Sequence, residues 1–264
     1  MLRSIFTFAG LLALSAAVPI GQDATPSSSS HLKAVRAPME LPRTSPVLDT
    51  REASCAISLG CQSAAEEVTG DTDDGTTWGL RITNSGDETA TYFLYQNSCD
   101  CVPYKYITIE ANCTSFVALS TGFQGRIVRG TTEMNLDGNS HLLGTWVEVN
   151  IGSDGVAWGN ISLIKGCDGA AAIAALDGTA VSTGFDEWLL DGAPDDAYEA
   201  KDDGVKVIKQ TEALDNANTI IYASRDYLAG KLGYTKAYVD DHHGNPVICS
   251  SNGRMAITFY KGRT

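Results

Sequence analysis

Short segments in which apolar and polar residues alternate make up most of the chain from Thr76 onward. Segment 145–151 alternates with a period of two, and after a Ser-Asp-Gly turn segment 156–164 repeats the pattern. Such alternation is typical of strands with one buried face. Further strands are expected at 76–83, 92–95, 104–109, 115–119, 125–128, 246–249 and 255–260. Strands this short, separated by Gly, Asn and Asp turns, predict an all-β sandwich or barrel.

Two later segments depart from this pattern. Segment 217–232 carries apolar residues at helical spacing, and Gly233 is well placed to end that helix. Segment 186–203 holds eight acidic residues and one basic residue, which predicts a solvated acidic loop region.

The first 51 residues predict an export signal followed by a linker. Arg3 precedes an apolar run from Ile5 to Val18, and the small residues Ser15-Ala16-Ala17 follow the pattern of a signal-peptidase site. The run is shorter than the roughly 20 residues that a membrane span needs. We therefore expect a signal peptide at 1–21, a disordered Ser- and Pro-rich linker or pro-segment at 22–51, and one domain at 52–264.

Composition agrees with a secreted protein that has no membrane span. The formal net charge is −13, which disfavours nucleic acid as a partner. Seven cysteines suit an oxidising compartment, and their spacing does not fit a zinc knuckle. Two sequons offer glycosylation sites at Asn112 and Asn160.

Four segments, in order, resemble the thaumatin-like (osmotin-fold) proteins. They are LRITN at 80–84, the stretch 109–131 with its Gly-Arg-Ile strand, the hairpin 145–166, and the C-terminal part 224–259 with its helix, Ala-Tyr-x-Asp-Asp and Ile-Thr-Phe. The family's Thr-Gly-Asp-Cys core is absent, so the chain is most similar to divergent, cysteine-poor secreted forms of fungi. The resemblance implies an antiparallel β-sandwich with one helix, and a disulfide between Cys167 and Cys249.

The same resemblance implies an acidic cleft linked to β-1,3-glucan. Glu148 matches the cleft glutamate, and Arg129, with Arg126 as the second choice, matches the cleft arginine. Asn160 and Lys165 stand where two cleft aspartates are expected, and a third position falls near Gly233. Trp146 and Trp158 share the outer face with Glu148, and exposed aromatic rings stack on sugars.

These observations predict a secreted, monomeric protein that needs no cofactor. We expect it to bind cell-wall carbohydrate of the β-glucan type, through a surface that comprises Glu148, Arg129, Trp146 and Trp158. The alternatives are an effector, inhibitor or antimicrobial factor acting on a protein, and a weak endo-β-1,3-glucanase. Hydrolysis needs two carboxylates, and Lys165 is expected to keep Glu148 ionised, so we expect no efficient glycosidase unless Asp154 or an acid of 186–203 supplies the partner.

Other chemistry has weaker support in the sequence. The run Asp240-Asp241-His242-His243 has metal-binding residue types, but adjacent strand residues point to opposite faces. Ser140-His141 lacks the context of a serine hydrolase.

Overall fold

The computed structural model describes residues 60–213 and 218–264. The predicted signal peptide, the predicted linker and Cys55 lie outside these residues. The elements are β1 (Glu66–Val68), β2 (Gly79–Asn84), β3 (Ala90–Gln96), β4 (Lys105–Ile109), β5 (Thr114–Ala118), β6 (Gln124–Gly130), α1 (Thr132–Asn135), β7 (Trp146–Ile151), β8 (Ala157–Ser162), β9 (Gly169–Ala175), β10 (Ser182–Gly184), η1 (Asp195–Ala197), β11 (Tyr198–Ala200), β12 (Lys206–Ile208), α2 (Tyr222–Leu232), β13 (Ile248–Ser250) and β14 (Arg254–Gly262).

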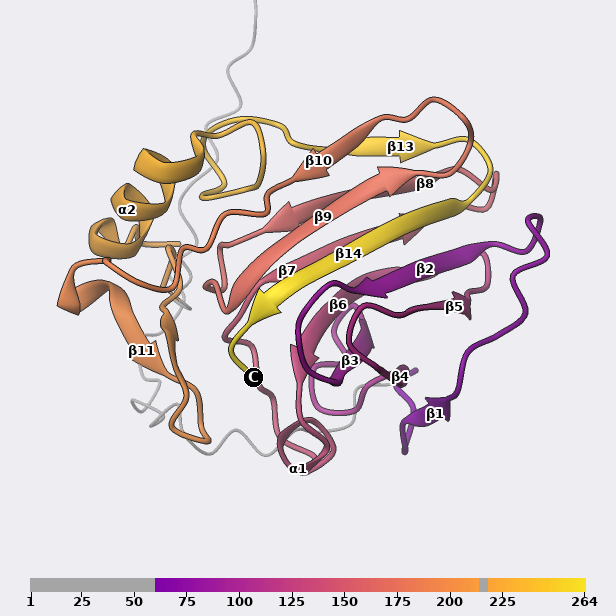
Figure 1. Ribbon diagram of the computed structural model, residues 1–264, viewed down its shortest axis with the longest axis horizontal. Helices are drawn as coiled ribbons and strands as arrows, with labels where there is room; N and C mark the ends of the chain where they lie inside the picture. Colours follow the sequence, from indigo (N-terminus) through magenta and orange to yellow (C-terminus); the bar gives the residue numbers. More distant parts are fainter. Residues whose placement is uncertain (1–59, 214–217) are drawn as a thin grey trace, which may run out of the picture. The chain divides into compact units, whose positions relative to one another are not determined.

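Two sheets face each other and form the sandwich that the alternating pattern predicts (Figure 1). The seven-stranded sheet has the order β1-β4-β3-β6-β7-β8-β13, and the five-stranded sheet has the order β10-β9-β14-β2-β5. A separate hairpin pairs β11 with β12. Most neighbours are antiparallel, but β14 runs parallel to β2, and β1 runs parallel to β4.

The core lies between the two sheets. Tyr92 of β3 stacks on Phe259 of β14, with ring centroids 4.5 Å apart, and both side chains are buried. Leu80, Ile127 and Val147 are fully buried in the same cluster. Burying aliphatic and aromatic side chains of this size stabilises the fold by about 1.5–3 kcal/mol each.

The predicted strands between residues 76 and 164, and the last two, are confirmed within a few residues. The alternating pattern did not indicate β9, because its sequence GAAAIAA is rich in alanine, which has little preference for strands. Strand β9 nevertheless lies inside the five-stranded sheet, between β10 and β14.

The predicted helix is α2, and Gly233 ends it with a φ of 66°, in the left-handed region that favours glycine. The acidic segment 186–203 is more ordered than expected. It contains η1 and β11, and Leu189, Leu190 and Ala197 are buried. Its charges therefore lie on the outside of a packed segment.

The cysteine prediction is wrong. Cys167 and Cys249 are both free thiols, because Cys167 is fully buried whereas Cys249 points outward from β13 between buried Ile248 and Ser250. The structure instead pairs Cys61 with Cys99, 38 residues apart, a loop whose closure stabilises the fold by about 4 kcal/mol in the chain-entropy view. Cys101 is also disulfide-bonded.

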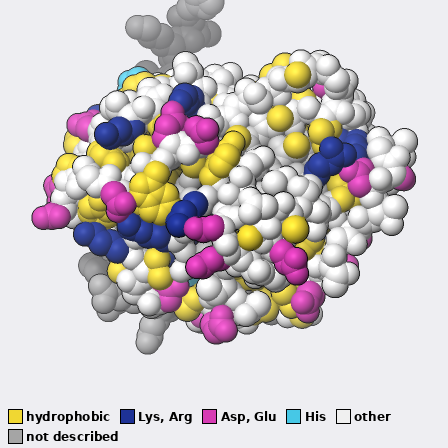
Figure 2. Space-filling view, viewed as in Figure 1, with side chains coloured by type: hydrophobic (Ala, Val, Ile, Leu, Met, Phe, Trp, Pro, Cys, Tyr) yellow, Lys and Arg dark blue, Asp and Glu magenta, His cyan; other side chains and the backbone are white. Residues whose placement is uncertain are grey.

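Within the described part of the chain, no helix is long and apolar enough to cross a membrane. On the face of the five-stranded sheet that Figure 2 shows, uncharged side chains and backbone occupy the middle of the view. Charged side chains gather toward the side of α2 and toward the opposite rim.

Candidate functional site: the groove at Glu148

The outer face of the seven-stranded sheet carries the candidate residues in regular rows. In a sheet, residues paired directly across neighbouring strands point to the same face and lie about 5 Å apart. One row runs across β6, β7 and β8 as Arg126, Glu148 and Asn160. The next row, two residues along the strands, places Gln124, Asn150 and Trp158 side by side.

Except for Arg126, the residues of these two rows line a groove with a cavity volume of about 190 Å³. Its lining includes amide, carboxylate and aromatic side chains: Asn97, Gln124, Glu148, Asn150, Trp158 and Asn160. Trp158 is 50% exposed, and Gln124 and Asn150 are exposed. Hydrogen-bonding amides beside an exposed indole face form a surface suited to the hydroxyls and ring faces of a sugar.

Glu148 is one of the residues that line this groove, and it is half-buried. Burial raises its pKa, whereas a hydrogen bond from Asn160 and the positive charge of Arg126 act in the opposite direction. The negative charge of Asp241 raises the pKa further, Lys165 lowers it, and the balance is a raised pKa. Lys165 therefore acts in the expected direction, but desolvation is the larger effect and the net shift in the pKa of Glu148 is upward.

Arg126, the second choice for the cleft arginine, occupies the position beside Glu148. Its side chain is almost fully buried between two rings, with the guanidinium carbon 4.1 Å from the Trp146 ring centroid and 4.7 Å from that of Tyr95. Its Nη1 donates to Asp100 at 2.7 Å, while Nε and Nη2 have no partner among the described residues. Trp146 is thus committed to packing on Arg126, and its indole Nε1 donates to the Leu142 carbonyl.

Arg129 does not belong to the groove, which corrects the sequence prediction. Three positions along a strand reverse the direction of a side chain, so Arg129 points between the sheets while Arg126 points outward. Its Nη1 donates to Asp168 at 2.9 Å, and its Nη2 donates to the carbonyls of Ala170 and Tyr260. It is a structural residue of the core.

A second carboxylate whose negative charge acts on Glu148 comes from a segment that the sequence analysis treated as structural. Asp241 is exposed, and its charge acts on both Glu148 and Tyr238. The adjacent Asp240 is buried and accepts hydrogen bonds from Arg225 at 3.2 Å and from His243 at 2.9 Å. The sequence contained one signal for this difference. In an extended segment adjacent side chains point to opposite faces, so one of the two neighbouring carboxylates, Asp240 or Asp241, is expected to be exposed.

Asp154, which the sequence analysis named as a possible partner of Glu148, is engaged in a turn. Asp154 belongs to the turn between β7 and β8, where its Oδ1 accepts from the Val156 backbone.

Within the described residues, no group of three or more His, Cys, Asp or Glu side chains is arranged to hold a metal ion.

The two sequons differ in their surroundings. Asn112 is exposed in a turn, with a φ of 58° that asparagine tolerates better than most residues. Asn160 lies within β8, and its Oδ1 is buried. Asn112 thus remains an accessible glycosylation candidate, whereas a glycan on Asn160 would fill the groove.

Comparisons with known proteins add little to this geometry. No family model matches the sequence, and no curated protein matches it. One similar solved structure is the protein elicitor MoHrip2 from Magnaporthe oryzae, with 9% identity, 42% of this chain and 78% of that chain covered, and a TM-score of 0.30. Another is a laminaripentaose-producing β-1,3-glucanase in complex with laminaritetraose, with 13% identity, 70% and 99% covered, and a TM-score of 0.43. Structural similarities with TM-scores this low support no conclusion about the fold or the function of this chain.

Proposed function

We propose that this protein is a secreted, thaumatin-like protein that binds cell-wall carbohydrate of the β-glucan type through the groove at Glu148. The observation that carries the proposal is the half-exposed Trp158, which stands in one row with the amides of Gln124 and Asn150 beside the half-buried Glu148. An indole stacks on a sugar ring, while amide and carboxylate groups pair with its hydroxyls. The resemblance at 145–166 supports the same part of the chain as the site.

Retention on insoluble glucan, chitin and cellulose tests the proposal. The native protein is expected to be retained on the glucan, and Trp158→Ala is expected to lose about tenfold or more of its affinity, as central aromatic contacts do. Trp188→Ala is the matched control, because Trp188 is 42% exposed and its indole Nε1 is already bonded to Asp191. Retention that survives Trp158→Ala, or falls equally in both variants, contradicts the proposal.

Glycoside hydrolysis is the second candidate function, and the raised pKa of Glu148 together with the charge of Asp241 that acts on it favours this candidate. A carboxyl group with a raised pKa suits a general acid, and a second carboxylate suits a base or nucleophile. The expectation of no efficient glycosidase assumed that this second carboxylate was missing. Reducing-sugar release from laminarin that disappears in both Glu148→Gln and Asp241→Asn, but not in Asp87→Asn, would establish hydrolysis.

Binding to no polysaccharide would favour the third possibility, a secreted factor that acts on a protein and uses the sandwich as a scaffold.

A further inference from the structure

The row of side chains that contains Trp158 continues past β6 to the end of β3. Asn97 follows β3 directly, and its backbone N–H donates to the Gln124 carbonyl at 2.9 Å, which extends the pairing of β3 with β6 by one residue. The row is therefore Asn97, Gln124, Asn150 and Trp158, at four neighbouring strand positions in the order β3-β6-β7-β8. Because neighbouring strands lie about 4.8 Å apart, the row extends for roughly 14 Å across the sheet.

A second hollow adjoins the groove at the Asn97 end of this row. Its cavity volume is about 260 Å³, and its lining includes Asn97 and Gln124, which also line the groove. On the far side it is bounded by the disulfide between Cys61 and Cys99. The groove and this hollow together form one extended groove, which runs across the strands from Trp158 to the disulfide.

The three amides of the row are available to a ligand. Asn97, Gln124 and Asn150 are exposed, and within the described part of the chain their side chains have no hydrogen-bond partner. Other asparagines are engaged by the fold, since the Nδ2 of Asn84 donates to two carbonyls and that of Asn252 donates to a third. Each free amide offers two N–H donors and a carbonyl acceptor, which are the groups that pair with sugar hydroxyls.

The charge of the extended groove narrows the class of ligand. Among the described residues that line its two parts, only Glu148 is charged, although the chain has a formal net charge of −13. The net charge repels an anionic polymer, and a cationic polymer would meet a single carboxylate. A neutral chain, whose hydroxyls pair with the amides, fits the extended groove better than either.

We propose that the extended groove binds one neutral glucan chain, which crosses the strands with one sugar ring on Trp158 and further rings over Gln124 and Asn97. The inference rests on the proposed function at Trp158, and adds to it the direction of the chain and the need for more than two sugar rings. A disaccharide that stacks on Trp158 is too short to reach Asn97, whereas a longer chain reaches it and the hollow beyond. The disulfide between Cys61 and Cys99 holds that end of the groove in place before binding.

Isothermal titration calorimetry of the whole protein with laminaribiose and with laminarihexaose tests this inference. Asn97→Ala is expected to lower the affinity for laminarihexaose about fivefold, as for one lost hydrogen bond, and to leave the affinity for laminaribiose unchanged. Trp158→Ala is expected to lower both affinities. The contrast between the two sugars in Asn97→Ala is decisive, because a longer chain gains some affinity merely through the number of ways in which it can lie on Trp158.

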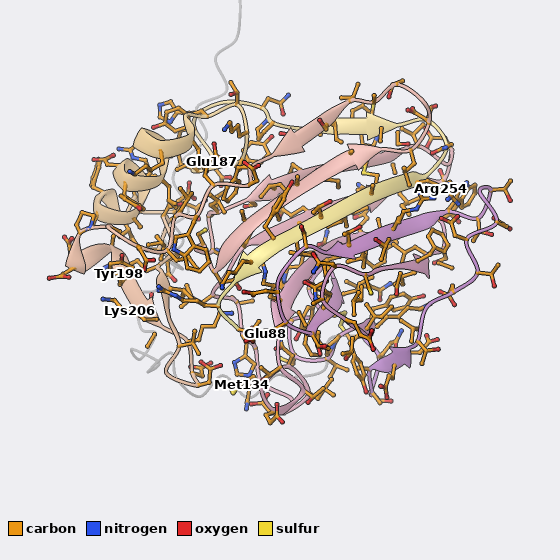
Figure 3. The ribbon with its side chains drawn as sticks, viewed as in Figure 1. Glu88, Met134, Glu187, Tyr198, Lys206 and Arg254 are labelled. Carbon is orange, nitrogen blue, oxygen red and sulfur yellow. A yellow bond between two sulfur atoms is a disulfide. The ribbon has the colours of Figure 1, made fainter. Side chains whose placement is uncertain are left out.

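Asn139→Ala is the matched control for the loss of an exposed amide. Asn139 lies in the loop after α1, and α1 follows the end of β6 that is opposite Gln124. Figure 3 labels Met134 of α1. The Nδ2 of Asn139 already donates to Asp137 at 3.0 Å, so this variant is expected to bind both sugars like the native protein.

The results separate this inference from the proposed function on which it rests. If Asn97→Ala binds laminarihexaose as tightly as the native protein does, while Trp158→Ala loses binding, the chain does not follow the row and only this inference is overturned. The same holds if Asn97→Ala weakens laminaribiose and laminarihexaose equally. If the native protein binds neither sugar, both the inference and the proposed function are overturned.

Discussion

Replacing Asp168 by asparagine tests how much the buried ion pairs of this carboxylate contribute to the free energy of unfolding. The Asp168 carboxylate is fully buried, and it accepts from Arg129 and from Lys201, each at 2.9 Å, and from the Thr145 backbone at 3.2 Å. Asparagine keeps the shape of the side chain but leaves Arg129 as a buried cation without a counter-charge.

Breaking a buried ion pair by removing one partner costs about 3–5 kcal/mol. A urea dependence of about 2 kcal/mol per M then predicts a midpoint lower by about 1.5–2.5 M in equilibrium unfolding. Asp87→Asn is the control, because Asp87 pairs with Lys261 on the exposed surface, and no measurable change in its midpoint is expected. A decrease of less than about 0.5 M for Asp168→Asn would refute the reasoning.

The same carboxylate sets a dependence on pH. Because the folded pKa of Asp168 is lowered, its contribution to stability is present above the ordinary value of 3.8 and is lost as the pH falls through the lowered folded value. The difference between native protein and Asp168→Asn should therefore shrink in strongly acidic solution. A difference that is constant down to about pH 2 would contradict this.

Three further predictions follow from single residues. Because burial raises the pKa of Glu148, the native protein should lose stability relative to Glu148→Gln as the pH rises above the ordinary value of 4.5, measured by urea unfolding across that range. Thiol reagents should label the exposed Cys113 and Cys249 in the folded protein. Cys167 should react only after unfolding, because it is fully buried and its pKa is raised to about 11. Peptide mass spectrometry of the labelled protein would show which cysteines have reacted. In a eukaryotic secretory host, Asn112→Gln should remove a glycan, while Asn160→Gln should leave the mass of the glycoprotein unchanged apart from the residue itself.

Much of the fold could be predicted from the sequence because most of its strands alternate cleanly. Segment 145–151 has one face buried and the other half-exposed, so its period of two is visible in the residues themselves. Strand β9 could not be found in this way, because its alanines look alike on both faces and its place depends on β14, about 80 residues further along the chain.

The site was predicted less completely than the fold. Glu148 and Trp158 lie on one hairpin, so local pairing was enough to bring them together. The effect of the Asp241 charge on Glu148 arises only in the tertiary fold, and the choice between Arg126 and Arg129 required the register of β6. The raised pKa of Glu148 could not be predicted from the sequence either. It results mainly from the burial of the side chain, which is known only from the structure, and not from the charges of residues nearby in the sequence.

The position of β14 has a consequence for how the protein is made. This strand lies between β2, which it pairs in parallel, and β9, so two strand edges of the five-stranded sheet have no partner until residues 254–262 have left the ribosome. Since β2 and β14 are separated by about 170 residues, and chains are synthesised at about 5–20 residues per second, β2 waits for roughly 9 to 34 seconds during translation. The sandwich is thus completed after synthesis of its last strand, and a growing chain that stops before residue 254 carries open edges for chaperones or aggregation.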